Sequence, residues 1–249
     1  SGPYTLGLNL ANANTWTGIQ NFSVGATAST LSTTGNLSVG GTLSIAGRSI
    51  FANNIGITGA ETLQSSTSSV LHYKNLASYN YSSSPITGTL KITMPKSWSA
   101  TMGTTTIKGY NYSNDGEWEV VVSGYNFTGN PDPFWTNYSA SINGDAPFNQ
   151  VRLAYDIGTS KNVILIGTTA TTWSYPKAIV TDFIAGHNNI TGWDSGWTMA
   201  ITTDESNITT SVTPTIKTYL ATNGNFGINT ISPSYKLDVA GNGRFTSTL

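Results

Sequence analysis

The sequence lacks cysteine and carries little charge. Its 249 residues include no Cys, 11 Lys and Arg and 12 Asp and Glu, for a net charge of −1. Without cysteine, neither a disulfide framework nor a Cys-based metal site can form. Because there is no basic stripe or polybasic patch, we expect no nucleic-acid partner. No apolar run is long enough to cross a bilayer, and we therefore expect no membrane insertion.

Charge is scarcest in the first part of the chain, where apolar residues recur in a short pattern. Between Thr33 and Gly59, two apolar residues separated by one polar residue alternate with glycine and small polar residues. These pairs are Leu37 and Val39, Leu43 and Ile45, and Ile55 and Ile57. Each pair lies on one face of a short strand, and the glycines permit tight turns. Such a strand cannot bury its thin apolar edge alone, so we predict that several copies wind together into a fibre.

A flexible linker is the alternative for this segment, because residues 1–70 are rich in Ser, Thr and Asn. Disordered segments usually combine high net charge with few aliphatic residues. Here only Arg48 and Glu61 are charged, and Leu, Ile and Val recur regularly. The pattern favours an intertwined β-stalk over a linker. The chain begins without Met, so we expect it to be a fragment of a longer protein.

From about Val70 onward, aromatic and charged residues become frequent. About 150 residues are enough to bury an independent core. Alternation places Trp118, Val120 and Val122 on the inward face of one strand, and Lys161–Gly167 is a continuous apolar run typical of a central strand. The predicted strands are Thr87–Pro95, Glu117–Tyr125, Val151–Ile157, Lys161–Gly167, Ala178–Gly186 and Trp197–Asp204.

The spacing of these strands indicates the fold class. No segment shows a sustained helical period, and turns rich in Gly, Asn and Pro separate the strands, as in an antiparallel β-sandwich or jelly roll. We predict an all-β protein in three parts. Residues 1–69 form a trimeric intertwined β-stalk, residues 70–220 a jelly-roll-like antiparallel β-sandwich head, and residues 221–249 a short C-terminal β-neck.

Two phrases in the sequence resemble one family of viral fibres. TWTGIQNF, at Thr15–Phe22, resembles a TWTG.Q.F phrase that recurs in the shafts of bacteriophage tail-fibre proteins. GNFGINTISPSYKLDVAGNGRFTSTL, at Gly224–Leu249, resembles the phrase that leads into a C-terminal intramolecular chaperone of the endosialidase type. Asn229 and Ile231 depart from that phrase, in which Gly and Thr are common at these places. In the head, the phrases VRLAYDIGTSKNVILIG, at Val151–Gly167, and TTWSYPKAIVTDF, at Thr171–Phe183, look similar to the head domains of such fibres.

The resemblance implies a homotrimeric tail fibre of a virion, which acts outside the cell. In that family the chaperone trimerises the fibre and is then removed by its own serine-lysine chemistry, and we expect it to be missing after Leu249. The implied function is host-cell attachment, in which the head binds a surface glycan or a protein receptor. Two alternatives stay open, namely a polysaccharide depolymerase and a purely structural fibre segment.

A depolymerase of the glycoside-hydrolase type needs two carboxyl groups about 5 to 10 Å apart, one of them with a raised pKa. Glu117 and Glu119 share the outward face of one strand, which is more typical of a solvated surface. The other pairs are Asp204 with Glu205, and Asp182 with Asp194, which lie on opposite faces or in different elements. We therefore predict no catalytic residues, no enzymatic activity and no cofactor.

Aromatic residues in or beside loops are better candidates for a binding site. Trp and Tyr rings stack on the apolar faces of sugars and donate hydrogen bonds. Strand phase assigns Trp118 and Trp197 to the core. The predicted receptor-binding residues are Tyr110, Tyr112, Phe134, Trp135, Trp193 and Asp194. The structural alternative is that these aromatics plug the ends of the sandwich or line the interface between subunits.

The sequence contains two histidines, His72 and His187. Neither has another His, Asp or Glu within four residues, whereas a zinc site needs three or four ligands. We therefore predict no metal site within one chain. A three-fold axis that gathers three copies of His187 is the one arrangement that would provide such a site.

Overall fold

The computed structural model describes residues 37–45, 61–64, 69–83, 85–112, 116–221 and 223–243. The chain divides into two compact units, Ser1–Asn54 and Ile55–Leu249. Throughout the described ranges, regular structure consists of strands, as expected for an all-β protein. No helix in these ranges is long and apolar enough to span a membrane.

Only residues 37–45 of the first unit are described, and they form no strand in the single chain. Leu37, Val39, Leu43 and Ile45 are all between 43% and 61% exposed. A strand is stabilised by hydrogen bonds to a neighbouring strand, and no described strand pairs with this segment. The rest of the predicted stalk repeat, including Ile55 and Ile57, lies outside the described residues, as does the TWTGIQNF phrase.

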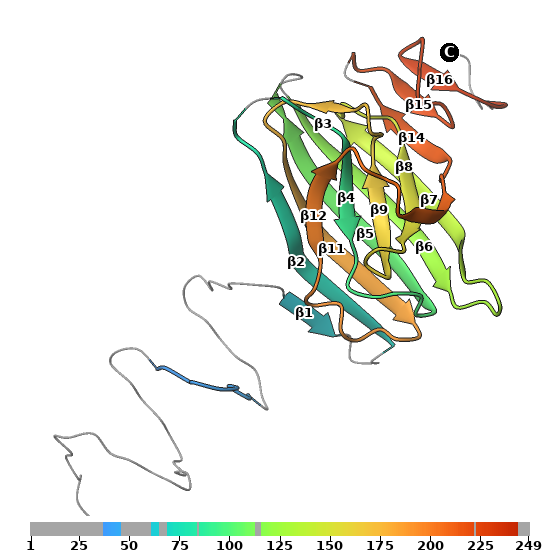
Figure 1. The fold of residues 1–249 in the computed structure, drawn as a ribbon. Coiled ribbons are helices and arrows are strands. Elements are labelled where there is room, and N and C mark those ends of the chain that lie inside the picture. Colours follow the sequence, from blue (N-terminus) through green and yellow to red (C-terminus); the bar gives the residue numbers. More distant parts are fainter. Residues whose placement is uncertain are drawn as a thin grey trace, which may run out of the picture. The chain divides into compact units, whose positions relative to one another are not determined.

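The second unit contains a large sheet and a small sheet (Figure 1). The large sheet has the strand order β1-β2-β11-β5-β6-β7-β14-β15-β16. Its strands are β1 (Glu61–Gln64), β2 (Val70–Asn80), β11 (Lys177–His187), β5 (Thr101–Asn111), β6 (Gly116–Phe127), β7 (Phe134–Gly144), β14 (Ile216–Leu220), β15 (Phe226–Ile228) and β16 (Leu237–Val239).

The small sheet has the order β12-β4-β9-β8-β13. It consists of β12 (Thr198–Thr202), β4 (Thr89–Thr93), β9 (Lys161–Ile166), β8 (Val151–Asp156) and β13 (Ile208–Val212), while β3 (Ile86–Thr87) and β10 (Thr172–Trp173) form a separate two-stranded ladder. Most neighbouring strands are antiparallel, as predicted. Two pairs differ, because β14 runs parallel to β7 and β15 runs parallel to β16.

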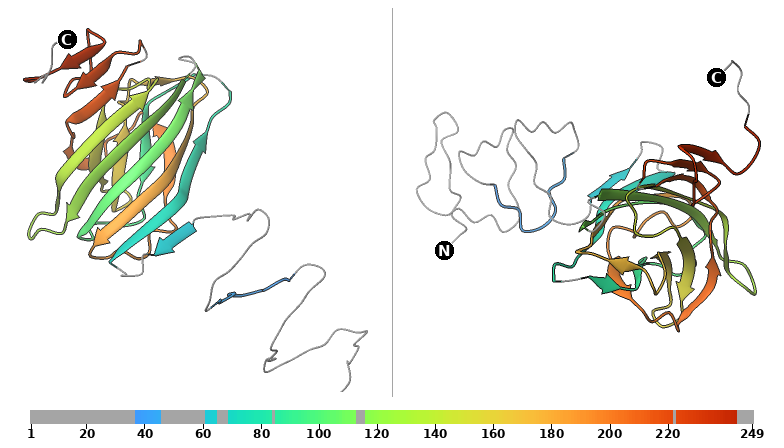
Figure 2. Two further views of the ribbon diagram at one scale, coloured as in Figure 1. Left: turned by 180° about the vertical axis from the view of Figure 1, so that it is seen from behind. Right: turned by 90° about the horizontal axis from the view of Figure 1, so that it is seen from above.

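The core lies between the two sheets, which face each other in Figure 2. Ile107, Val120 and Ile142 of the large sheet and Ile92 and Ile164 of the small sheet are completely buried there. Burial of an aliphatic side chain contributes about 1.5–3 kcal/mol, so this alternation of inward apolar residues holds the sheets together. Strand β6 follows the predicted pattern, with Trp118, Val120 and Val122 buried.

The apolar run in β9 is explained by burial on both faces. This strand is in the middle of the small sheet, as predicted. Ile164 and Ile166 point into the main core, while Val163 and Leu165 form a second buried cluster with Ala154. A strand covered on both sides needs no polar face, and its sequence therefore shows no alternation.

Three long strands of the large sheet, β2, β5 and β7, are not predicted from the sequence. Strand β5 carries glycines and threonines in place of a regular apolar face, and in β2 the positive φ of 57° at Asn75 interrupts the alternation. These strands are specified by pairing, because β5 bonds to β6 along its whole length from Thr101 to Asn111. Such long-range pairing leaves little trace in the local sequence.

Candidate functional site: an exposed tyrosine groove

The six predicted receptor residues differ widely in exposure. Tyr110, Tyr112 and Phe134 are 40%, 60% and 43% exposed, and Asp194 is exposed as well. Trp135 and Trp193, in contrast, are only 5% and 0% exposed. The expectation that all of these aromatics reach solvent from loops is therefore wrong for both tryptophans.

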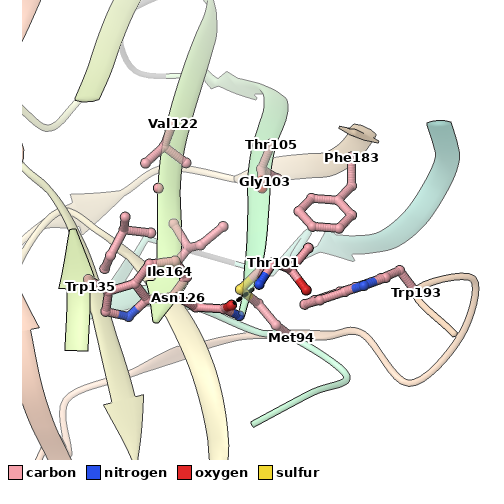
Figure 3. A pocket seen from close by; sticks show the side chains of 12 residues that line it. Met94, Thr101, Gly103, Thr105, Val122, Asn126, Trp135, Ile164, Phe183 and Trp193 are labelled. Carbon is pink, nitrogen blue, oxygen red and sulfur yellow. Dashed lines mark hydrogen bonds between the residues drawn. The ribbon is translucent and has the colours of Figure 1, made fainter. Parts of the chain in front are cut away.

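Both tryptophans belong to the core for clear physical reasons. The Trp193 indole donates a hydrogen bond of 2.9 Å to the carbonyl of Asn189, and its ring centroid lies 4.6 Å from that of Phe183. The Trp135 indole donates to the carbonyl of Ala154 at 3.2 Å. Figure 3 shows both rings beside an interior cavity of only about 10 Å³. That space is too small for a sugar, and the indoles are satisfied internally.

The exposed residues also separate into different places. Phe134 on β7 packs against Phe127 on β6, with ring centroids 5.3 Å apart. This pair lies at the end of the large sheet where β11 ends and where His187 contacts Tyr125. Tyr110 lies at the opposite end of β11, because it pairs with Lys177. The predicted residues therefore do not converge on a single site.

Tyr110 and Tyr112 do converge with a third tyrosine. They line an open groove of about 390 Å³ together with Ser82, Tyr175 and Lys177. We call this the tyrosine groove. Tyr112 and Tyr175 meet edge to face, with ring centroids 5.6 Å apart and an interplanar angle of 79°. The groove therefore combines three partly exposed aromatic rings from segments that are distant in the sequence.

The segment between β10 and β11 is anchored so that its side chains alternate between core and groove. Trp173, Ser174 and Pro176 are buried, whereas Tyr175 and Lys177 are exposed. The Trp173 indole donates to the carbonyl of Gly88 at 2.8 Å. This anchoring fixes where the Tyr175 ring emerges, and it needs no ligand to form.

Backbone hydrogen bonds fasten the same segment on both sides. The amide of Ser174 donates to Oδ1 of the fully buried Asn111 at 2.7 Å, and the amide of Tyr112 donates to the carbonyl of Ser174 at 2.9 Å. On the other side, the amide of Tyr81 donates to the carbonyl of Pro176 at 3.0 Å. The groove is therefore preorganised, which reduces the entropy that a ligand must overcome.

Tyr175 has an unusual backbone conformation, with a φ of 47°. A bulky residue at positive φ is disfavoured, and such outliers cost on the order of 1–3 kcal/mol and cluster at ligand-binding sites. Sequence analysis missed Tyr175. The signal that points to it is the phrase WSYPK, in which an aromatic residue precedes a proline next to a lysine.

Two of the carboxylates considered for glycoside hydrolysis, Glu119 and Glu205, are held in ion pairs. Glu119 pairs with Lys108 at 3.0 Å, and Glu205 receives two hydrogen bonds of 2.7 Å from Arg152. The Arg152 guanidinium holds the pKa of Glu205 below its usual value. A general acid for glycoside hydrolysis needs the opposite shift. Neither group lines the tyrosine groove.

The two histidines have ordinary partners. Nε2 of His72 lies 2.7 Å from a carboxylate oxygen of Asp182. The His187 ring meets Tyr125 at 5.6 Å between centroids, and its Nε2 lies 3.3 Å from the amide nitrogen of Asn188. Within the described part of the chain, no three His, Asp or Glu side chains gather into a metal-binding group.

Comparison with known proteins adds no family. No protein-family profile, no curated protein and no solved structure matches this chain.

Proposed function

We propose that this chain is part of a virion tail fibre that attaches to a host cell, and that the tyrosine groove binds a surface glycan. The observation that carries the proposal is the gathering of Tyr110, Tyr112 and Tyr175 around an open, preorganised groove. Aromatic faces bind the C–H surfaces of sugar rings, and phenol groups hydrogen-bond to sugar hydroxyls. The fibre-like phrases at Thr15–Phe22 and Gly224–Leu249 supply the biological context.

A homotrimer is part of this proposal. Its support is the exposed set Leu37, Val39, Leu43 and Ile45, which finds no apolar partner within the described part of the chain. Three intertwined stalks would bury these residues against one another. Three heads per fibre would also multiply a weak individual affinity through avidity. For the head we propose jelly-roll connectivity, supported by the crossings between the sheets from β2 to β4, β4 to β5 and β7 to β8.

The trimer has a direct test in light scattering. We expect the purified chain to have three times the single-chain mass of 26.3 kDa. Leu43→Asp should lower the trimer fraction, because it buries three carboxylates close together. Ser44→Asp, which adds the same charge at the neighbouring position on the other face, should leave the trimer intact. A wild-type mass of one chain would contradict the trimer.

The binding site has its own test. Tyr112→Ala and Tyr175→Ala should each weaken binding of the purified chain to host cells about tenfold, which corresponds to about 1.4 kcal/mol for one lost stacking contact. Tyr235→Ala is the matched control, because Tyr235 is 74% exposed but lies outside the groove. Affinity is measured by titrating labelled protein onto cells and onto immobilised glycans.

Two outcomes separate this proposal from its alternatives. Release of reducing ends from host polysaccharide by the wild-type chain would indicate a depolymerase. If the wild-type chain neither binds cells nor competes with virus for them, only a structural fibre segment remains. Equal losses for Tyr112→Ala and Tyr235→Ala would move the binding site away from the tyrosine groove.

A further inference from the structure

We propose that the tyrosine groove selects glycans that carry an anionic group, a carboxylate or a phosphate, and that the ammonium group of Lys177 binds this group. The inference rests on the proposed glycan-binding function and adds the class of ligand. It follows from three observations, namely the place of Lys177 in the groove, the absence of a nearby carboxylate partner among the described residues, and the fixed position of the aromatic rings beside it.

Lys177 belongs to the groove by its place in the sheet. It is the first residue of β11, it is exposed, and it pairs in register with Tyr110 on β5. Residues directly opposite each other in an antiparallel pair have Cβ atoms about 4.5–5.5 Å apart. The buried Pro176 just before it and the pairing of β11 with both β2 and β5 fix its backbone. The lysine therefore emerges beside an aromatic ring from a rigid strand.

Unlike Lys91 and Lys108, Lys177 has no carboxylate partner among the described residues. Lys91 lies 3.1 Å from Asp156, and Lys108 lies 3.0 Å from Glu119. Among the described residues that line the tyrosine groove, none is Asp or Glu. Glu117 on β6 pairs with Tyr110 on the side away from Lys177, and it lines a separate depression. No carboxylate in the described part of the chain therefore competes with a ligand for the charge of Lys177.

The combination of rings and ammonium group suits one class of sugar. The rings bind the apolar face of any hexose, but a neutral sugar offers the ammonium group only hydroxyl oxygens and no opposite charge. A lysine ammonium has three N–H donors and acts as a point charge, which matches a carboxylate or a phosphate without strict geometry. A sugar with such a group therefore satisfies both parts of the groove.

The test uses the full chain and three immobilised oligosaccharides of the same length, one neutral, one containing a uronic acid and one containing a phosphodiester. We expect the wild-type chain to bind both anionic probes about tenfold more tightly than the neutral one, and added salt to reduce this preference. Lys177→Gln should abolish the preference for the anionic probes. Lys177→Arg should retain it, and Lys217→Gln, which removes an exposed charge outside the groove, should change nothing.

The outcomes distinguish this inference from the proposed function. Equal affinity for neutral and anionic probes, or an unchanged preference in Lys177→Gln, would overturn the anionic selectivity while Tyr112→Ala still reduced binding. Failure of the wild-type chain to bind any of the probes or the cells would overturn the glycan-binding function and the inference with it. A preference for only one of the two anionic probes would support the inference and identify the source of the charge.

Discussion

Replacing Trp193 with alanine is expected to lower the free energy of unfolding by about 3–5 kcal/mol, the range for removing a large aromatic from a packed core. The Trp193 side chain is completely buried. Its ring contacts Phe183 at 4.6 Å between centroids, and its indole satisfies the carbonyl of Asn189. Alanine removes these contacts together and leaves a cavity that the two rigid sheets cannot close.

Urea denaturation followed by circular dichroism measures this loss. Trp193→Phe should cost less than Trp193→Ala, because it keeps an aromatic ring against Phe183 and loses the indole hydrogen bond. Tyr112→Ala is the surface control, and it should change stability by no more than about 0.5 kcal/mol. Unchanged stability in Trp193→Ala would contradict its assignment to the core and restore it as a candidate for ligand binding.

Gly144→Ala is expected to lower the free energy of unfolding by about 2–4 kcal/mol, since it combines backbone strain with overpacking. Gly144 ends β7 with a φ of 83°, a region that residues with a side chain rarely adopt. A Cβ there would lie 2.2 Å from the carbonyl oxygen of Glu117. That oxygen already accepts the amide of Asp145 at 2.8 Å, so the backbone cannot move away without losing this bond.

Gly186→Ala provides the matched control within the same sheet. Its φ is not positive, and the nearest atoms to an added Cβ are 3.9 Å away. Thermal melts of both variants should therefore show a clear decrease in Tm for Gly144→Ala and little change for Gly186→Ala. Similar melting temperatures for the two variants would contradict the tight approach of Gly144 to β6.

Part of the candidate site is readable from the sequence because it depends on local pattern. Tyr110 and Tyr112 are two residues apart, so they emerge on the same face of the chain at the end of β5. Their exposure follows from that phase and from their position where the strand ends. Tyr175 and Lys177 obey the same rule around the buried Pro176. What no local pattern reveals is that these two pairs meet.

That meeting is decided by tertiary structure, through the pairing of β11 with β5 and the hydrogen bonds from Ser174 to Asn111 and from Tyr112 to Ser174. The burial of Trp193 is also decided by tertiary structure, because its ring packs against Phe183 and so becomes part of the core.

The sequence by itself determined the all-β class, the alternation of β6 and the central place of β9, because strand period and apolar runs are properties of neighbouring residues. It left open which loop aromatics are buried and which gather into a groove, because both depend on contacts between residues far apart in the chain. Those contacts exist only once the sheets have paired and packed.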